Sequence, residues 1–226
     1  MPTLDEGAVI ERLLEQLQPA RAAGHELILV DGGSRDSTVA RAKSSVDRLL
    51  HSEPGRARQM NLGATVSRGE WLWFLHADSR LPEGWLAWLE DTCNAREHDW
   101  GFFRIQLDNP RWPYRMISDL MNLRSTITGI ATGDQAIFIR RSLFFAGNCF
   151  PNLPLMEDVA LSRRLKAKRP CILSGPVITS ARRWERNGVA RTILHMWSLR
   201  LAFWLGIPPK RFAHRYTSCS SPDTES

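Results

Sequence analysis

Two apolar runs of the sequence end directly in side chains that can hold a cation or a polar ligand. ELILV (26–30) is followed by Asp31, and WLWFL (71–75) is followed by His76 and Asp78. In sheets of parallel strands flanked by helices, ligands bind beyond the carboxyl ends of the strands. We therefore expect Asp31 and Asp78 at the same edge of one sheet. Asp78 is the expected ligand of Mg²⁺ or Mn²⁺, and a nitrogen ligand from His76 would favour Mn²⁺.

Each of these positions also has a plainer interpretation. Asp78 can cap a turn or helix before Pro82. Glu157 and Asp158 fall in the first turn of a predicted helix, where acids are common caps. The helix dipole there favours the carboxylate, so we expect Asp158 to be ionised, with a lowered pKa, and able to accept a proton. Asp134 precedes a predicted strand and is either a ligand contact or a turn residue.

The apolar patterns along the chain alternate between strand and helix, which is typical of a doubly wound α/β sheet. The expected strands are 26–30, 48–53, 71–75, 101–108, 135–141 and a β-like segment over 172–184. The expected helices are 8–17, 38–45, 55–69 after a short loop, 82–93, 157–167 and 189–206. We expect 108–133 to be a loop, and 217–226 to be a disordered tail.

Composition narrows the class of protein. The chain has 226 residues, 43% of them apolar, and nine tryptophans, enough for a real core. Its four cysteines are scattered, which argues against a zinc site or a disulfide framework. No basic-then-apolar leader opens the sequence, so we expect a cytoplasmic protein. The longest uncharged stretch near the end, LAFWLGIPP (201–209), is too short to span a bilayer.

Charge is unevenly distributed along the chain. Residues 1–139 carry a net −4, whereas 140–216 carry a net +12, and arginine outnumbers lysine by 26 to 4. An anionic ligand or surface beside the C-terminal third would explain this, although genome composition explains the arginine content equally well. The segment 182–206 is basic and rich in tryptophan, so it is either a core helix or a peripheral contact with the inner membrane face. Nucleic acid is not expected, because no recognised binding module joins the basic residues.

Several motifs together resemble a known family. VDGGSRDST (30–38) resembles the V-D-D-G-S-x-D-x-T turn of family 2 glycosyltransferases with the GT-A fold, and LHADSRLP (75–82) resembles the strand end that carries its D-x-D metal motif. The further similar segments are PTLDE (2–6) and MEDVALSRRL (156–165). GRARQMNLGA, TGDQAIF and SARRWERNG are similar to the radical-SAM/selenodomain-associated, or arsenosugar-biosynthesis, subgroup.

The resemblance implies a fold and an activity. The fold would be GT-A: a Rossmann-like, doubly wound mixed sheet flanked by helices, with a C-terminal helical extension. Residues 1–216 would form one domain, with the nucleotide-binding part over about 1–100 and the acceptor side over about 101–216. The activity would be inverting, metal-dependent transfer of a sugar from a nucleotide-sugar to a hydroxyl of a small-molecule or lipid-linked acceptor.

The resemblance also implies roles for individual residues. Asp158, with Glu157 beside it, would be the general base, and Asp78 with His76 would hold Mn²⁺ or Mg²⁺. The donor would be bound by Thr3, Asp5, Glu6, Asp31, Gly33, Arg56 or Arg58, Asp134, Arg183 and Trp184.

Two departures from the family pattern are visible. His76 stands where the D-x-D motif has its first acid, although the subgroup favours this form. Family members also begin with an apolar strand before P-x-x-N-E, and here Met1 and Pro2 open the chain. The first strand is therefore expected to be missing, and our hypothesis is a start site placed too late.

Two other functions remain open from the sequence. A nucleotidyltransferase also sets acids over a Rossmann-like sheet, but it releases pyrophosphate instead of a nucleoside diphosphate. The third alternative is a non-catalytic, membrane-associated nucleotide-binding protein. The sequence indicates neither the sugar, nor the acceptor, nor the oligomeric state.

Overall fold

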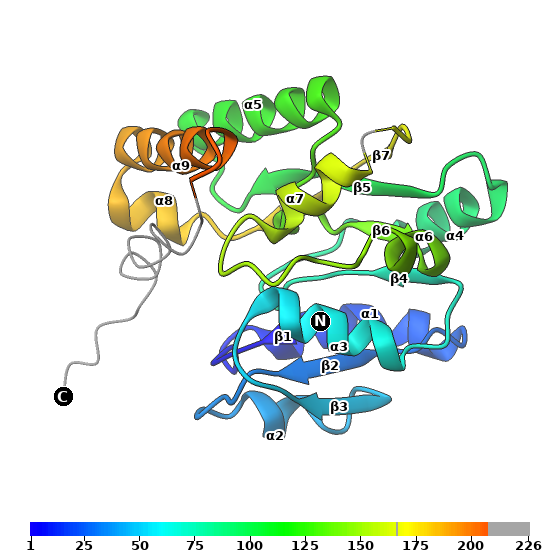
Figure 1. Cartoon of the computed structure of the whole chain (residues 1–226). Helices are drawn as coiled ribbons and strands as arrows, with labels where there is room; N and C mark the ends of the chain where they lie inside the picture. The colour runs from blue at the N-terminus through cyan, green and yellow to red at the C-terminus, as the bar shows by residue number, and fades with distance from the viewer. Residues whose placement is uncertain (166, 208–226) are drawn as a thin grey trace.

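The computed structural model describes residues 1–165 and 167–207, without the side chain of Arg183. The predicted tail at 217–226 lies outside this part. Within it, the chain forms two sheets that lie one above the other, with helices on their faces (Figure 1). The predicted α/β class with a mixed sheet flanked by helices is confirmed.

The N-terminal sheet is parallel, with strand order β1-β2-β3. Its strands are β1 (Pro2–Thr3), β2 (Ile28–Asp31) and β3 (Arg48–His51), and its helices are α1 (Ile10–Ala22), α2 (Thr38–Ala42) and α3 (Arg56–Val66). All four residues of β2 are buried, as a strand covered on both faces requires. Helix α1 buries one apolar stripe, which consists of Ile10, Leu13, Leu14 and Leu17.

The second sheet is mixed, with strand order β4-β6-β5-β7. Its strands are β4 (Trp71–Trp73), β5 (Trp100–Leu107), β6 (Phe138–Arg140) and β7 (Cys171–Thr179). Strand β6 is antiparallel to both of its neighbours, whereas β5 and β7 are parallel. The core is largely aromatic, and its largest fully buried side chains include Trp100, Phe102, Phe103, Phe138 and Phe144.

The remaining helices surround this second sheet. They are α4 (Trp85–Ala95), α5 (Trp112–Thr128), the 3₁₀ helix η1 (Gly133–Gln135), α6 (Arg141–Ala146), α7 (Glu157–Arg164), α8 (Arg182–Asn187) and α9 (Val189–Trp204). Helices α5 and α9 lie along the upper edge of the molecule in Figure 1. Within the described residues, no helix is both long enough and apolar enough to cross a bilayer.

Three structural expectations were wrong in detail. Hydrogen bonding divides the expected single sheet into two. Most of the expected loop 108–133 is helix α5, which starts with Pro113 in its first turn and ends at Gly129 in the left-handed conformation. The β-like segment 172–184 ends at Thr179, and α8 follows it, because Ser180 and Asp108 accept the backbone N–H groups at the start of that helix.

The first strand is present but short, so its expected absence is corrected. Pro2 pairs with Val30 and Thr3 with Asp31. The Met1 amine donates a hydrogen bond of 2.9 Å to the carbonyl of Ile28. Burial lowers the pKa of this amine to about 5. Its surroundings are therefore apolar enough to disfavour the ammonium form.

A cavity of about 790 Å³ adjoins Met1. Residues of β2 and β4 line it together with residues of α1, α3 and α4, and representative lining residues are Leu17, Ile28, Ala64, Leu72 and Trp85. Strand β4 pairs with β6 on one edge only. The cavity thus lies between the two sheets next to Met1, just before β1 begins.

Candidate active site

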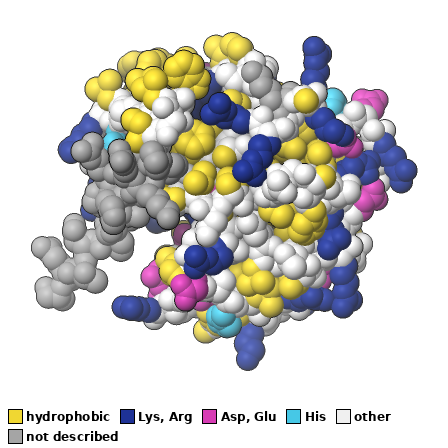
Figure 2. Space-filling model, in the orientation of Figure 1, with side chains coloured by type: hydrophobic (Ala, Val, Ile, Leu, Met, Phe, Trp, Pro, Cys, Tyr) yellow, Lys and Arg dark blue, Asp and Glu magenta, His cyan; other side chains and the backbone are white. Residues whose placement is uncertain are grey.

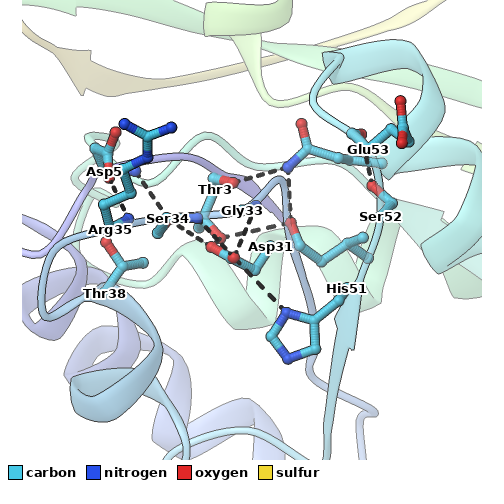
Figure 3. Close-up of polar contacts among 12 residues, drawn as sticks. Thr3, Asp5, Asp31, Gly33, Ser34, Arg35, Thr38, His51, Ser52 and Glu53 are labelled. Atoms are coloured by element: carbon cyan, nitrogen blue, oxygen red, sulfur yellow. Dashed lines mark hydrogen bonds and ion pairs between the residues drawn. The ribbon is translucent and has the colours of Figure 1, made fainter.

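Asp31, at the end of β2, organises the first turn of the site (Figure 3). It is 1% exposed. One carboxylate oxygen accepts the backbone N–H groups of Gly33 and Ser34, both at 2.9 Å, and the other accepts the hydroxyls of Ser34 at 2.5 Å and Thr3 at 3.4 Å. Burial raises the pKa of Asp31, but the hydrogen bonds from Ser34 and Gly33 outweigh it and keep the pKa below its usual range. Gly33 has φ of +95°, a conformation that suits glycine.

The segment that follows β1 is tied to the same turn. Asp5 accepts the backbone N–H of Arg35 at 2.8 Å, and its own N–H donates to the Ser34 hydroxyl at 2.9 Å. The Glu6 N–H donates to the Thr38 hydroxyl at 2.8 Å. These contacts fix the backbone on either side of Glu6, and so they determine where its carboxyl lies.

Glu6 links this turn to the second sheet. Burial and the nearby Asp78 raise the pKa of Glu6 to about 7, while Arg56 and Arg182 oppose that shift. Asp78 lies after the end of β4, and burial followed by the charge of Asp134 raises its pKa as well. The sequence placed the ends of β2 and β4 at one edge of one sheet. They belong to separate sheets, but Glu6, which is tied to the turn after β2, lies close enough to Asp78 for the two charges to interact.

Asp158 and Glu157 lie in the first turn of α7, and both have raised pKa values. Burial and Asp158 raise the pKa of Glu157 to about 7. Burial raises the pKa of Asp158 despite hydrogen bonds from the backbone N–H groups of Gly133, at 2.5 Å, and Val159, at 2.7 Å. The expected lowering of the Asp158 pKa is wrong, because burial outweighs the helix dipole and these hydrogen bonds.

Gly133 and Asp134 place η1 against this pair. His76 lies with Nδ1 3.5 Å from Oδ1 of Asp134. A Cβ added to Gly133 would lie 2.7 Å from Nε2 of His76 and 3.6 Å from Oδ2 of Asp158. The backbone of Gly133 therefore lies between the imidazole and the candidate base, and any larger residue there would require the imidazole or the loop to move.

Arg56 connects the acids of the site. It is the first residue of α3, and its charge lowers the pKa values of Glu6, Asp78, Glu157 and Asp158. The sequence left Arg56 and Arg58 as alternatives. Arg58 pairs instead with Glu53 at 3.3 Å, so Arg56 is the one that the fold directs to the acids.

Trp184 lies in a hydrophobic cluster and not with the carboxyl groups of the site. It packs with Tyr114, Met121 and Val189 against the cluster of Leu107 and Ile117. The side chain of Arg183 lies outside the described residues. From the sequence, Arg182, Arg183 and Trp184 could either close over the diphosphate or acceptor or form an Arg–aromatic packing cluster; the charge of Arg182 acts on both Glu6 and Asp78.

Two further residues of the site carried little sequence signal. His51, at the end of β3, lies with Nδ1 3.7 Å from Oδ2 of Asp31, and its side chain is 65% exposed (Figure 3). Gln59 is buried and donates to the carbonyls of Thr3 at 2.8 Å and Val30 at 2.9 Å. A histidine at a strand end could have suggested His51, whereas a glutamine within a helix gave no indication.

The carboxyl groups of the site suit a divalent cation that takes only one or two ligands from the protein and the others from water and phosphate oxygens. Five carboxyls share the site with two guanidiniums; the acids are Glu6, Asp78, Asp134, Glu157 and Asp158, and the bases are Arg56 and Arg182. The described residues contain no group of three or more His, Cys, Asp or Glu side chains close enough to hold a metal by themselves. Mg²⁺ commonly binds through one or two carboxylates together with water and phosphate oxygens.

Comparison with known proteins identifies the family. The model of glycosyl transferase family 2 matches residues 1–144. The chain belongs to this family. The family 2 domain is 32% identical over 155 residues to a "PGL/p-HBAD biosynthesis glycosyltransferase" of Mycobacterium bovis. The aligned region covers 64% of this chain and 59% of that relative. The domain is also 31% identical over 87 residues to an "Uncharacterized glycosyltransferase" of Haemophilus influenzae, covering 37% of this chain and 30% of that one.

Solved structures share the fold of this family 2 domain. S. aureus TarS 1–349 superimposes with a TM-score of 0.63 at 20% identity, over 80% of this chain and 59% of TarS. Glucosyl-3-phosphoglycerate synthase from Mycobacterium tuberculosis, in complex with Mn²⁺, UDP and glucosyl-3-phosphoglycerate, superimposes with a TM-score of 0.59 at 18% identity, over 99% of this chain and 79% of that one. The GT-A type of fold is thus confirmed.

Proposed function

We propose that this protein is an inverting, metal-dependent glycosyltransferase that moves a sugar from a nucleotide-sugar to an acceptor hydroxyl. The observation that carries the proposal is the cluster of carboxyls around Arg56, with Asp158 held by the backbone of Gly133. Family membership and the Mn²⁺ and nucleotide complexes of structural neighbours support it.

The N-terminal half would bind the nucleotide. Asp31 holds the turn of Gly33 and Ser34, so its own carboxylate acts mainly by positioning the backbone. The base and ribose would lie over this turn and contact Thr3, Asp5 and the exposed ring of His51. Arg56 and Arg182 would bind the diphosphate, since guanidinium groups form charge-assisted hydrogen bonds with phosphate.

Asp78 would hold the cation, with His76 beside it. Bound there, Mg²⁺ or Mn²⁺ neutralises charge on the departing nucleoside diphosphate. The imidazole of His76 contacts Asp134 and the backbone of Gly133, so it also positions both. Burial and then the charge of Asp78 raise the pKa of Glu6, and burial and then the charge of Asp134 raise the pKa of Asp78. A cation bound among these acids would favour their charged forms.

Asp158 would act as the general base. The acceptor oxygen attacks the anomeric carbon, its proton passes to Asp158, and the bond from that carbon to the diphosphate oxygen breaks on the opposite side. One displacement inverts the anomeric configuration. The raised pKa of Asp158 makes it a stronger base than an ordinary aspartate, which suits this step.

The acceptor is proposed only as a class. A small molecule, as the arsenosugar subgroup suggests, and a lipid-linked hydroxyl both remain candidates. The chain spans 59% of the length of the mycobacterial relatives that it matches, so their printed pathway does not transfer to it.

Product analysis tests the proposed reaction. The protein is incubated with Mn²⁺ and a panel of UDP- and GDP-sugars, and released nucleotide is separated chromatographically. We expect nucleoside diphosphate, released faster by wild type than by the Asp158→Asn variant. Release of pyrophosphate would favour a nucleotidyltransferase, and binding without turnover would favour a non-catalytic nucleotide-binding protein.

A further inference from the structure

Helix α5 exposes an apolar stripe to solvent. Its members are Trp112, Met116, Leu120, Leu123 and Ile127, which are 42–74% exposed. They are spaced four, four, three and four residues apart, so they lie on one face of the helix. The opposite face, with Ile117, packs against Leu107 and Ala181. The exposed stripe is therefore not needed to bury this helix against the domain.

Helix α9 exposes a second apolar stripe. Its members are Leu194, Trp197, Leu201, Trp204 and Leu205, which are 57–71% exposed. The inner side of α9 packs through Leu199 against Leu155, Met156 and Val159. Like α5, this helix has one face in the core and another apolar face without a partner in the described structure.

The two helices that carry these stripes pack against one shared hydrophobic cluster. Residues of α5, including Tyr114 and Met121, share a cluster with Val189 at the start of α9. Figure 2 shows hydrophobic side chains gathered over the upper part of the molecule, where Figure 1 places these helices. We call the ten exposed residues of both stripes the α5–α9 face. Exposed apolar side chains gathered on neighbouring helices in this way mark an interaction surface.

The exposed charged residues near the helices of the α5–α9 face are mostly basic. Apart from Arg182, whose charge acts on the acids of the candidate site, the exposed arginines of α5, α8, α9 and the residue before α5 are Arg111, Arg115, Arg186 and Arg191. The exposed acids of the same helices are Asp119 and Glu185, and Glu185 is bound to Asn109 at 2.6 Å. These charged residues, which we call the rim of the α5–α9 face, therefore carry a net positive charge. That charge complements an anionic surface.

We propose that the α5–α9 face docks on an anionic lipid bilayer. Its tryptophans and leucines would enter the boundary between headgroups and acyl chains, and its arginines would contact the headgroups. A second copy of this chain fits less well, because a two-fold contact would bring the same basic rim against itself.

This position has a consequence for the candidate active site. Helix α7, which carries Asp158, packs on the inner side of α9. Docking on α9 would hold the acids about one helix diameter, roughly 10 Å, from the lipid surface. If the proposed function holds, on which this step rests, the acceptor hydroxyl belongs to a molecule anchored in the same bilayer.

Vesicle flotation of the full chain tests the docking without any assay of activity. We compare phosphatidylcholine vesicles with vesicles that also contain phosphatidylglycerol. Wild type is expected to float with the anionic vesicles. The double variants Trp197→Glu/Leu201→Glu and Leu120→Glu/Ile127→Glu are expected to bind at least about tenfold more weakly. The matched control is Trp88→Glu, which alters a tryptophan of α4 that is 41% exposed and lies off this face.

A second pair of variants tests the charge. Arg115→Gln/Arg191→Gln should weaken binding about tenfold or more, whereas the control Arg12→Gln/Arg96→Gln on α1 and after α4 should not. Because the glutamate variants could unfold, the unmodified protein is also probed by tryptophan quenching with brominated lipid. Quenching should fall when Trp197 and Trp204 become phenylalanine, but not when Trp88 does.

Three results would overturn the proposal. The first is that wild type fails to float with anionic vesicles, and the second is that the variants of the α5–α9 face bind vesicles as tightly as wild type does. The third is that wild type binds no lipid but forms a dimer in sedimentation, and that Trp197→Glu/Leu201→Glu abolishes this dimer. Failure of flotation would leave the product assay unaffected, so the docking and the proposed reaction can be separated.

Discussion

The backbone N–H of Gly133 donates a 2.5 Å hydrogen bond to Oδ2 of Asp158, and the same glycine lies against the ring of His76. One residue of η1 therefore positions both the candidate base and the imidazole that follows β4. It connects α7 with the end of β4, two elements that are far apart in the sequence. The geometry of the proposed site depends on this contact.

Replacing Gly133 with alanine should disable the transfer step. Its Cβ would lie 2.7 Å from Nε2 of His76, so the imidazole or the loop must move, and the hydrogen bond to Asp158 would lengthen. We expect the transfer rate to fall about a hundredfold, since small displacements of catalytic groups have effects of this size. Steady-state kinetics measures it, and nucleotide binding followed by thermal shift is the control. A variant with a wild-type rate would contradict the positioning role.

Asp158→Asn should separate catalysis from structure. The amide oxygen can still accept the N–H of Gly133, but it cannot accept a proton from the acceptor. We expect kcat to fall by about 10²–10⁴-fold with little change in the KM for the donor. Glu157→Gln, on the neighbouring residue, is the matched control and should cost much less. An equal loss in both variants would argue against Asp158 as the base.

Glu157 should make the stability of the ligand-free protein depend on pH. Its pKa is raised to about 7 in the folded state, compared with 4.5 for the ordinary group, so the folded state binds more protons than the unfolded state between these values. The free energy of unfolding should therefore fall as pH rises from about 4.5 to about 7. Urea denaturation at several pH values should show a flatter dependence for Glu157→Gln than for wild type, and no such change for Glu15→Gln on the exposed side of α1. An unchanged pH dependence in Glu157→Gln would show that folding does not destabilise the charged form of Glu157.

A strand added before Met1 should stabilise the domain. It would enter the cavity of about 790 Å³ between β2 and β4 and would replace the buried amine by a peptide bond. The pKa of that amine is lowered to about 5, so it makes stability rise with pH between about 5 and 8, and this contribution should disappear. Six apolar β-forming residues are expected to raise the melting temperature and the soluble yield, whereas six Gly and Ser residues should not. No gain from the apolar extension would show that the cavity between β2 and β4 does not accept a further strand.

The sequence predicted most of the elements, because their periodicities were strong. The apolar run before Asp31 and the run before His76 became β2 and β4, and the spacing of Ile10, Leu13, Leu14 and Leu17 became α1. Helix α5 was missed because its apolar stripe faces solvent, and because Pro113 within it, with Pro110 before it and Gly129 after it, favours a loop. The division into two sheets was not predictable from patterns, since it depends on how far β1 extends.

The candidate site was only partly predictable. Sequence motifs and the family resemblance indicated Asp78, Asp134 and Asp158, but not that Gly133 would lie among them. The direction of the Asp158 pKa was wrong, since burial is a tertiary property that a helix position does not reveal. The choice between Arg56 and Arg58 likewise needed the structure, because both lie in the first turn of α3.

Nucleotide binding to wild type and Asp78→Ala, measured by calorimetry with UDP and GDP in the presence of Mn²⁺, Mg²⁺ or a chelator, tests the central claim most directly. Asp91→Ala, an exposed acid of α4, is the matched control. We predict that wild type and Asp91→Ala bind one nucleoside diphosphate only with the metal, and that Asp78→Ala binds at least about tenfold more weakly. Binding that is equally tight in the chelator, or unchanged in Asp78→Ala, would contradict a metal-dependent donor site at the end of β4.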